Sequence, residues 1–307
     1  MKTLFSRNHE TVRAVDGVSF TIERGERVGF LGPNGAGKTT TLKMLSGLLH
    51  PTAGECTVDG HVPFRREVAL LEKITLVMGQ KSQLIWDLPP SETYALNCAV
   101  FDIPKPRFHA ALEELTELLE LGGLLDKPAR QLSLGERMKC ELAAALLHGP
   151  SVLFLDEPTF GLDVAMQLAV RDFIRRYNQA HQATVLLTSH YMQDVVALCP
   201  RIIVIDRGKL VHDGDLKALV KALDPDKRVS FTLPHPINDD DALGKLGAVL
   251  ARDGARITLR VSERELPGVV SHLLGTLEVA DLGIEDPPLE DVLRVMFGAA
   301  REAAVNE

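Results

Sequence analysis

Short apolar runs alternate with longer segments of helical periodicity along the first two thirds of the chain. Strand-length apolar runs stand at residues 27–31, 151–155, 183–187 and 202–205. Segments with helical character lie at residues 40–49, 108–121 and 132–147. Strand and helix signals that alternate in this way are typical of crossover units on a parallel sheet. The pattern therefore predicts an α/β fold.

Weaker signals add further elements to this fold. Short β-rich segments are expected between residues 12 and 31, with a further strand over 54–59. A hairpin turn is predicted at residues 206–209, between strands at 201–205 and 210–212. Residues 80–149 are predicted to form a helical subdomain, in which Ser133 and Glu136 resemble a capping box before the helix at 132–147. The expected architecture is a mixed β-sheet core with an antiparallel β subdomain and a helical subdomain.

A second pattern begins where the composition turns polar, near residue 224. Strands are predicted over 229–233 and 257–261, and helices over 240–252 and 266–274. We therefore expect a first domain over residues 1–225 and a small C-terminal α+β domain over residues 226–307, with a ferredoxin-like or half-ferredoxin layout. Since no catalytic constellation stands out in it, we expect a regulatory, packing or dimerisation role.

Composition narrows the class of protein. The chain has 307 residues, and its 45% hydrophobic and 25% charged residues are typical of a globular protein. The net charge of −8 disfavours unspecific attraction to nucleic acid, so no nucleic-acid partner is expected. We expect no membrane-spanning helix, because no apolar run approaches roughly 18 residues, and no signal peptide within residues 1–10. Four scattered cysteines favour a reducing cytoplasm over zinc or disulfide chemistry.

A complete G-x-x-x-x-G-K-[ST] phosphate-binding loop follows the apolar run at residues 27–31. Its glycines let the backbone turn tightly and direct N–H groups at phosphate oxygens, and the next helix points its positive end at the same anion. Lys38 can reach the β- and γ-phosphates, and the hydroxyl of Thr39 is placed to bind Mg²⁺. The predicted nucleotide-binding residues are Gly32, Pro33, Asn34, Gly35, Ala36, Gly37, Lys38, Thr39 and Thr40.

Two adjacent carboxylates end a second apolar strand, at Asp156 and Glu157. In phosphoryl transfer, one such carboxylate can hold Mg²⁺ and the other can accept a proton from the attacking water. We assign these roles to Asp156 and Glu157 respectively. A phosphate-binding loop alone leaves kinases, GTPases and many ATPases open, and together with Lys38 these two carboxylates favour Mg²⁺-dependent hydrolysis of the bound nucleotide.

Four further motifs stand in a fixed order with these two: Gln80, Leu132-Ser133-Leu134-Gly135-Glu136, Gly161-Leu162-Asp163 and His190. As a set, the chain resembles the nucleotide-binding subunit of an ATP-binding-cassette (ABC) transporter, where the corresponding motifs are the Q-loop, the LSGGQ signature, the D-loop and the switch histidine. The resemblance covers about residues 1–220. It implies a P-loop NTPase fold of the ABC ATPase type.

The resemblance also implies how these residues act. Two ATP molecules lie between two head-to-tail subunits, so that Lys38 of one copy and Ser133 of a second copy, or of a homologous ATPase subunit, bind the same γ-phosphate. Gln80 contacts Mg²⁺ and the attacking water, and His190 orients Glu157. The partner for the adenine ring is expected near the start of the chain, at Phe5 or else at His9.

The signature departs from the family pattern at two positions. Leu134 stands where the family has Gly, and Glu136 where it has Gln. Leu134 adds bulk and Glu136 adds negative charge near an anion-binding backbone, and either change can weaken the contact with phosphate. Ser133 and Gly135, which matter most for that contact, are present.

A membrane partner is implied as well. Lys81 to Pro90 lies where the family docks the coupling helix of an integral-membrane transporter subunit, which places the protein peripherally on the cytoplasmic face of the membrane. Trp86, the only tryptophan, is expected either in that docking groove or in the core of the helical subdomain. The phrases at residues 14–20, 29–35 and 287–293 are similar to ABC-2 type exporters, drug and antibiotic efflux systems among them.

Two other functions remain open at this stage. A soluble ABC-family ATPase without a transporter is disfavoured by the single cassette and the lack of a heptad tract. An ATP-dependent switch that binds without turnover is disfavoured by Glu157 and His190 but left open by Leu134 and Glu136.

Overall fold

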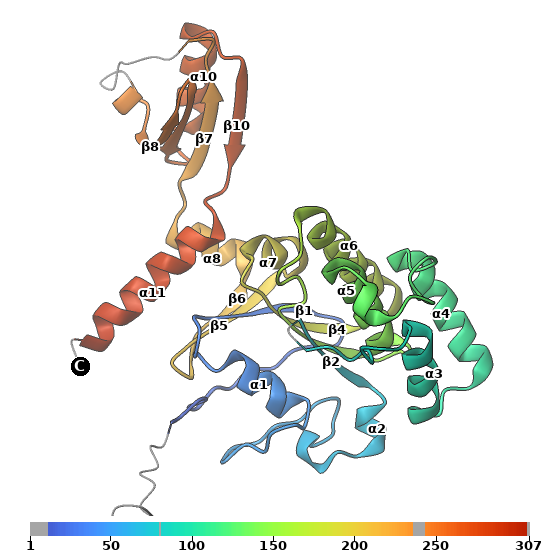
Figure 1. The fold of residues 1–307 in the computed structure, drawn as a ribbon. Coiled ribbons are helices and arrows are strands. Elements are labelled where there is room, and N and C mark those ends of the chain that lie inside the picture. The colour runs from blue at the N-terminus through green and yellow to red at the C-terminus, as the bar shows by residue number, and fades with distance from the viewer. Residues whose placement is uncertain (1–11, 80, 236–242, 306–307) are drawn as a thin grey trace, which may run out of the picture. The chain divides into compact units, whose positions relative to one another are not determined.

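The computed structural model describes residues 12–79, 81–235 and 243–305, with side chains up to residue 297. The chain divides into two compact units, Met1–Gly214 and Asp215–Glu307. Each unit has its own hydrophobic cluster and its own sheet. Figure 1 shows the elements of both.

The first unit is built on a six-stranded sheet with the order β2-β3-β4-β1-β5-β6. Its strands are β1 (Arg27–Leu31), β2 (Ile74–Met78), β3 (Val152–Asp156), β4 (Thr184–Thr188), β5 (Arg201–Asp206) and β6 (Lys209–Asp215). All pairings from β2 to β5 are parallel. A two-residue turn joins β5 to β6. Such a short connection can join only antiparallel neighbours, so β6 runs antiparallel to β5. The predicted strands at 27–31, 151–155, 183–187 and 201–205 are confirmed.

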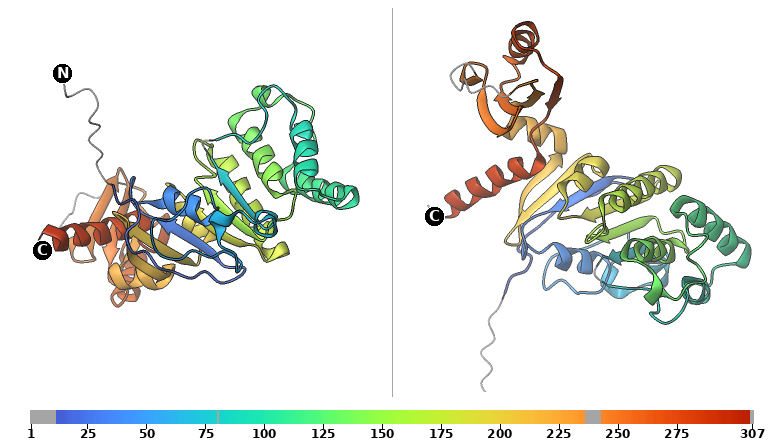
Figure 2. Two further views of the ribbon diagram at one scale, coloured as in Figure 1. Left: turned by 90° about the horizontal axis from the view of Figure 1, so that it is seen from below. Right: turned by 45° about the horizontal axis from the view of Figure 1, so that its top comes forward.

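Helices connect these strands. They are α1 (Lys38–Leu45), α2 (Val68–Leu71), α3 (Pro90–Val100), α4 (Lys105–Leu119), α5 (Leu134–Leu146), α6 (Val164–His181) and α7 (Met192–Leu198), with single turns of 3-10 helix at Pro63–Arg65 and Ala129–Gln131. The helices predicted over 40–49, 108–121 and 132–147 are confirmed as α1, α4 and α5. Figure 2 shows α3, α4 and α5, in green, gathered as one group away from the blue strand β1.

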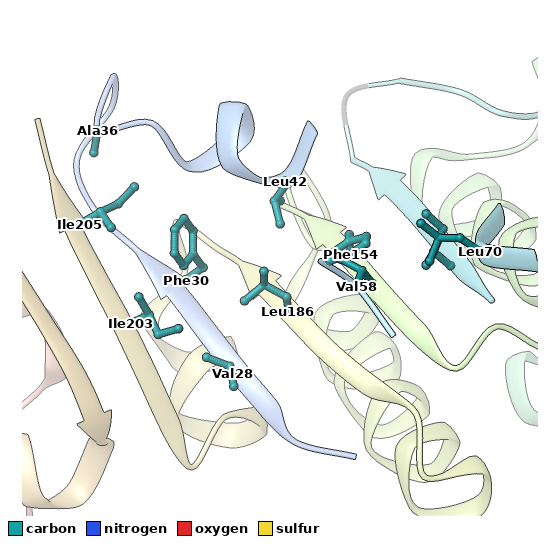
Figure 3. Packing of buried hydrophobic residues seen from close by; sticks show 11 residues of the cluster. Val28, Phe30, Ala36, Leu42, Val58, Leu70, Phe154, Leu186, Ile203 and Ile205 are labelled. Carbon is teal, nitrogen blue, oxygen red and sulfur yellow. The ribbon is translucent and has the colours of Figure 1, made fainter. Parts of the chain in front are cut away.

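The central strands of the first unit's sheet are buried on both faces, while the edge strand β6 is largely exposed. Val28 and Phe30 of β1 face α1, where they pack with Leu42 (Figure 3). Gly29 points to the other face, where a Cβ atom would come within 2.8 Å of the Val195 side chain of α7. Strands covered on both sides are typical of parallel sheets with crossover helices, which explains why their sequences are almost continuously apolar.

The segments at residues 12–26 and 54–59 were predicted to be β-rich, and they form no named strand. In the second segment only Val58 makes an isolated bridge, to His61. The backbone is left-handed at Gly54, Asp59 and Gly60, and such turn conformations interrupt a ladder. The described part of the first segment contributes through its side chains instead, since Phe20 and others pack against the core cluster.

The second unit carries a four-stranded antiparallel sheet with the order β10-β7-β9-β8. Its elements are α8 (Leu216–Leu223), β7 (Lys227–Thr232), β8 (Ala248–Asp253), β9 (Arg256–Val261), α10 (Leu266–Thr276), β10 (Asp281–Glu285) and α11 (Leu289–Val305). The expected elements at 229–233, 257–261 and 266–274 are confirmed.

The helix predicted over residues 240–252 is wrong in its C-terminal part, where the chain forms strand β8. The reason is the turn that follows. Gly254 and Ala255 form the two-residue turn between β8 and β9, which pair antiparallel, and Gly254 has a φ of 57°. Glycine at the first position of a two-residue turn between extended segments is a strong hairpin signal, and here it prevails over the weak helical spacing before it.

We expect Phe30→Ala to destabilise the first unit by about 3 to 5 kcal/mol, because it removes a fully buried ring (0% exposed) from the main core cluster. Urea unfolding followed by the fluorescence of Trp86, the only tryptophan, reports on that unit alone. Phe64→Ala, at a position 39% exposed, is the control and should cost less than about 1 kcal/mol. Equal losses in both variants would contradict the assignment of the core.

Candidate nucleotide-binding site

The phosphate-binding loop lies between the end of β1 and the start of α1. Its backbone is held so closely that side chains are excluded at two glycines. A Cβ atom on Gly32 would lie 2.2 Å from the carbonyl oxygen of Ile205, and one on Gly37 would lie 2.3 Å from that of Ala14. Gly37 also has a φ of 107°, which favours glycine. The loop therefore has a fixed shape, and its N–H groups stand at the N-terminus of α1.

Lys38 is the buried cation of this loop. Its Nζ donates to the carbonyl oxygens of Gly32 at 2.7 Å and of Pro33 at 3.1 Å. Burial lowers the pKa of the Lys38 ammonium, while the nearby charges of Glu157 and Asp156 act in the opposite direction. The ammonium is thus partly desolvated next to a loop shaped for an anion, which strengthens its attraction to phosphate.

Asp156, at the end of β3, accepts hydrogen bonds from residues of both α1 and β4. The Thr39 hydroxyl donates to Asp156 Oδ2 at 3.0 Å, and the Thr188 hydroxyl donates to Asp156 Oδ1 at 2.6 Å. A hydroxyl and a carboxylate at this distance are the hard oxygen donors that Mg²⁺ prefers, and Mg²⁺ commonly takes one or two protein ligands plus water and phosphate oxygens. The donor set fits the ion.

Glu157 and His190 meet at the same edge of the sheet. His190 Nε2 lies 2.8 Å from Glu157 Oε1, so Nε2 carries the proton of this contact. Glu157 has a left-handed φ of 56°, which costs energy for a residue with a side chain. Its N–H group compensates by donating to the carbonyl oxygen of Thr188 at 3.0 Å and to the Thr188 hydroxyl at 3.1 Å. The strained turn directs the carboxylate toward His190.

The signature residues lie on a different element, at the start of α5. Ser133 is the N-cap, and it forms a capping box with Glu136: the Ser133 Oγ accepts from the Glu136 N–H at 3.2 Å, and the Glu136 carboxylate accepts from the Ser133 N–H at 2.8 Å. The hydrogen bond from the Ser133 N–H lowers the pKa of the Glu136 carboxyl. The predicted capping box is confirmed, and it gives the unusual Glu136 a structural reason.

The other signature residues contact the D-loop of the same chain. A Cβ atom on Gly161 would lie 3.1 Å from Leu134 Cδ2, and one on Gly135 would lie 2.7 Å from Met166 Cγ. Asp163 is the N-cap of α6 and accepts from the Met166 N–H at 2.9 Å. The start of α5 and the start of α6 are therefore packed closely against each other.

The structure thus brings most predicted site residues together at the carboxyl ends of β1, β3 and β4: the phosphate-binding loop, Asp156, Glu157 and His190. Gln80 and Phe5 lie outside the described residues. Sequence reasoning missed Thr188, which bonds both acidic residues. The sequence contains a signal for Thr188, since Thr188 and Ser189 are polar residues at the end of an apolar strand, directly before His190.

The segment from Lys81 to Pro90 presents Trp86 on the surface. This side chain is 53% exposed, with the Arg137 guanidinium 5.6 Å from its ring centroid, so the alternative of a core aromatic is wrong. The backbone before it is fixed by Glu141 of α5, only 4% exposed. The Glu141 carboxylate accepts from the Gln83 N–H at 2.6 Å and from the Ser82 hydroxyl. The segment combines an open aromatic surface with an anchored backbone.

Comparison with known proteins identifies the family. A family model described as "ABC transporter" matches residues 15–160, and a model described as "EvrA-like ABC transporter, C-terminal domain" matches residues 225–285. The daunorubicin resistance ATP-binding protein DrrA3 of Streptomyces coeruleorubidus is 34% identical over 302 residues, which cover 94% of this chain and 92% of that one. This chain is an ATP-binding subunit of the ABC transporter family.

Two more comparisons show which known proteins this ABC ATPase subunit resembles. The Nod factor export ATP-binding protein I of Burkholderia lata is 35% identical, with 82% of each chain covered. A solved ATP-binding cassette, described as a dimeric post-hydrolysis state bound to ADP and Pi, matches with a TM-score of 0.62 and 24% identity over 69% of this chain and 94% of that one. The structural match supports the ABC ATPase fold of the first unit.

We expect Glu141→Ala to release the segment that holds Trp86, because three hydrogen-bond donors lose a charged acceptor. The variant should be less stable by about 2 to 3 kcal/mol and should show increased quenching of Trp86 fluorescence by acrylamide. Glu120→Ala is the matched control: Glu120 is exposed, stands at the end of α4 and pairs with Lys139 of α5, the helix that also bears Glu141. Unchanged quenching in Glu141→Ala would contradict the anchoring role.

Proposed function

We propose that this ABC ATPase subunit hydrolyses ATP with Glu157 as general base, in a head-to-tail dimer that drives a separate membrane subunit of an ABC-2 type exporter. The observation that carries the proposal is the 2.8 Å contact between His190 and Glu157, at the same strand edge as Lys38, Thr39 and Asp156. A phosphate-binding loop alone is common to many nucleotide-binding proteins. The additional base and histidine favour hydrolysis.

The residues of the loop bind the nucleotide. The N–H groups of residues 32–39 and the Lys38 ammonium receive the phosphates, and Thr39 and Asp156, with Gln80, are the proposed holders of Mg²⁺. When bound, Mg²⁺ supplies neutralisation of the phosphate charge that develops during transfer. Asp156 is held in place from two sides, by the hydroxyls of Thr39 and Thr188.

Glu157 and His190 supply the proton chemistry. The Glu157 carboxylate accepts the proton of a water molecule that attacks the γ-phosphate, and His190 fixes the orientation of that carboxylate through its Nε2 proton. The strained turn at Glu157 favours this assignment, because a left-handed residue with a side chain is typical of a functional position. This pair disfavours the alternative of an ATP-dependent switch without turnover.

A second copy, or a homologous subunit, is proposed to complete each site. Ser133 and Gly135 stand at the N-terminus of α5, whose first residues reach the surface while most of the helix is buried, and the positive end of the helix favours an anion there. Exposed apolar side chains surround them, namely Leu134, Phe160 and Val164. Surface apolar residues next to an anion-binding helix end fit a protein interface better than a solvated face.

The membrane partner is proposed to dock on the exposed surface around Trp86, together with Ile85 and Leu88. In the described part of the chain, no helix has both the length and the apolar character needed to span a bilayer. A peripheral position on the cytoplasmic face follows if a separate subunit forms the channel.

The relatives named for daunorubicin resistance and Nod factor export support export of a small molecule over a soluble ABC ATPase. For residues 226–307 we propose a regulatory or dimerisation role.

Glu157→Gln should lower the turnover number for ATP at least about 100-fold, because it removes the general base while leaving the phosphate-binding loop intact. With saturating Mg²⁺ and ATP the variant should elute as a dimer in size-exclusion chromatography, while the nucleotide-free protein elutes as a monomer. Release of phosphate at the wild-type rate would show that Glu157 is not the base. Elution as a monomer in ATP would argue against the proposed dimer.

Trp86→Ala should retain the basal ATPase activity of the isolated subunit and lose association with the membrane subunit encoded in the neighbouring reading frame. The reason is that Trp86 is exposed and makes no contact with the phosphate-binding loop. Co-purification from detergent extracts measures the association. Leu210→Ala, an exposed apolar position on β6, is the control and should co-purify normally. Undiminished association of Trp86→Ala would refute the docking surface.

A further inference from the structure

Asp194 forms a buried polar centre that the catalytic residues above do not include. This residue of α7 is 1% exposed, yet it carries a carboxylate. Its Oδ1 accepts from Arg171 Nε of α6 at 2.5 Å. Its Oδ2 accepts from the Ser189 hydroxyl at 2.7 Å and from the Thr159 hydroxyl. A buried carboxylate with this many donors joins three separate segments of the chain.

The first of these segments bears Glu157. Thr159 lies two residues after Glu157, and its carbonyl oxygen accepts from the Leu162 N–H at 3.2 Å. The Phe160 N–H donates back to the Glu157 carbonyl oxygen at 3.1 Å. The loop from Glu157 to Leu162 is therefore a set of tight turns, and the buried hydroxyl of Thr159 bonds it to Asp194.

The second segment bears His190. The Ser189 Oγ donates to Asp194 and at the same time accepts from the Tyr191 N–H at 3.0 Å. Ser189 and Tyr191 are the two neighbours of His190 in the chain. Their mutual bond folds the backbone at His190 into a turn, and Asp194 fixes that turn from inside the protein.

The third segment is α6, through Arg171. The Arg171 guanidinium is almost buried, and its Nη2 donates to Gln167 Oε1 at 3.4 Å. The Gln167 side chain in turn donates to the Leu162 carbonyl oxygen at 3.1 Å. The Arg171–Asp194 ion pair thus reaches the end of the loop that begins at Glu157.

We propose that Asp194, paired with Arg171, is a positioning residue for ATP hydrolysis: it holds the loop of Glu157 and the turn of His190 at the spacing that allows their 2.8 Å contact. The inference rests on the proposed function, in which these two residues carry out the proton chemistry. Asp194 is 1% exposed, so its carboxylate is closed off from a nucleotide at the surface of the site. It acts through Thr159 on one side and through Ser189 on the other.

A purely structural role for the ion pair would be to attach α7 to α6. The two roles differ in what they change. Lys38 and Thr39, which receive the phosphates, have no bond to this network in the described part of the chain; their own bonds go to Gly32, Pro33 and Asp156. A positioning role therefore changes turnover and leaves ATP affinity unchanged, whereas loss of helix attachment weakens both together with stability.

The test is Asp194→Asn in the full-length protein. The amide keeps the shape of the side chain but cannot accept from all three donors, and it leaves Arg171 without its counter-charge. We expect a loss in turnover number of about 10- to 100-fold, with a Kd for Mg²⁺-ATP within about twofold of the wild-type value. Asp172→Asn is the matched control, since Asp172 lies on α6 next to Arg171 and pairs with the exposed Arg175 and Arg176 of that helix. It should behave as wild type.

A double-variant cycle shows whether Asp194 acts through His190. In a His190→Ala background, the added Asp194→Asn change should lower turnover by less than about twofold, because the contact it protects is already absent. If the two losses multiply in full, or if Asp194→Asn weakens ATP binding as much as turnover, the positioning role is wrong. Should Asp194→Asn be insoluble, Ser189→Ala decides in its place: a loss of at least about threefold in turnover at unchanged affinity supports the role, and unchanged turnover refutes it.

Glu157→Gln separates failure of this inference from failure of the proposed function. If Glu157→Gln abolishes hydrolysis while Asp194→Asn keeps more than half of the wild-type turnover, the proposed function stands and the positioning role fails. If Glu157→Gln itself hydrolyses ATP at the wild-type rate, the base is wrongly assigned, and the positioning role fails with it.

Discussion

The position of β4 between β1 and β3 is the constraint on which the candidate site depends. Because all three strands run parallel, their carboxyl ends reach the same edge of the sheet, and residues more than a hundred positions apart in sequence meet there. The last residue of β4, Thr188, bonds to both acidic residues at this edge. Its hydroxyl donates to Asp156, and its carbonyl oxygen accepts from the N–H of Glu157. A shift of β4 by one residue would remove both bonds and turn the side chain to the other face.

The charges at this edge are held in place by contacts within the chain. Lys38 is partly desolvated and bonded to two backbone carbonyls. The Asp156 carboxylate accepts from two hydroxyls, and the Glu157 carboxylate accepts from His190 Nε2. Burial penalises an isolated charge, so such a cluster persists only where opposite charges and hydrogen bonds compensate. The same low-polarity surroundings strengthen attraction to an incoming phosphate. Preorganisation of this kind is what a phosphoryl-transfer site needs, because positioning and charge stabilisation supply most of the catalysis.

Local chemistry explains which parts of the protein could be predicted from sequence. The phosphate-binding loop and the capping box at Ser133 depend on neighbours a few residues away, and the pattern at those positions is sufficient. The network around Asp194 and the anchor at Glu141 depend on tertiary packing between distant segments, and a lone acid on a helix gives no signal for it. Strand β8 differs from its prediction for another reason: the hairpin turn at Gly254 and Ala255 outweighs the helical spacing before it.

Helix α5 links the two surfaces at which partners are proposed. Its N-cap is Ser133, the proposed contact to the second copy, and it bears Arg137 against the Trp86 ring and Glu141 against the backbone of Gln83. A helix of 13 residues is a rod of about 20 Å, which transmits displacement without bending appreciably. If the membrane subunit docks at Trp86, a movement there displaces α5 and therefore Ser133. The capping box gives Glu136 a further consequence: its carboxylate keeps the first turn of α5 closed, so the helix end that is proposed to contact phosphate is held as one piece with the rest of the helix.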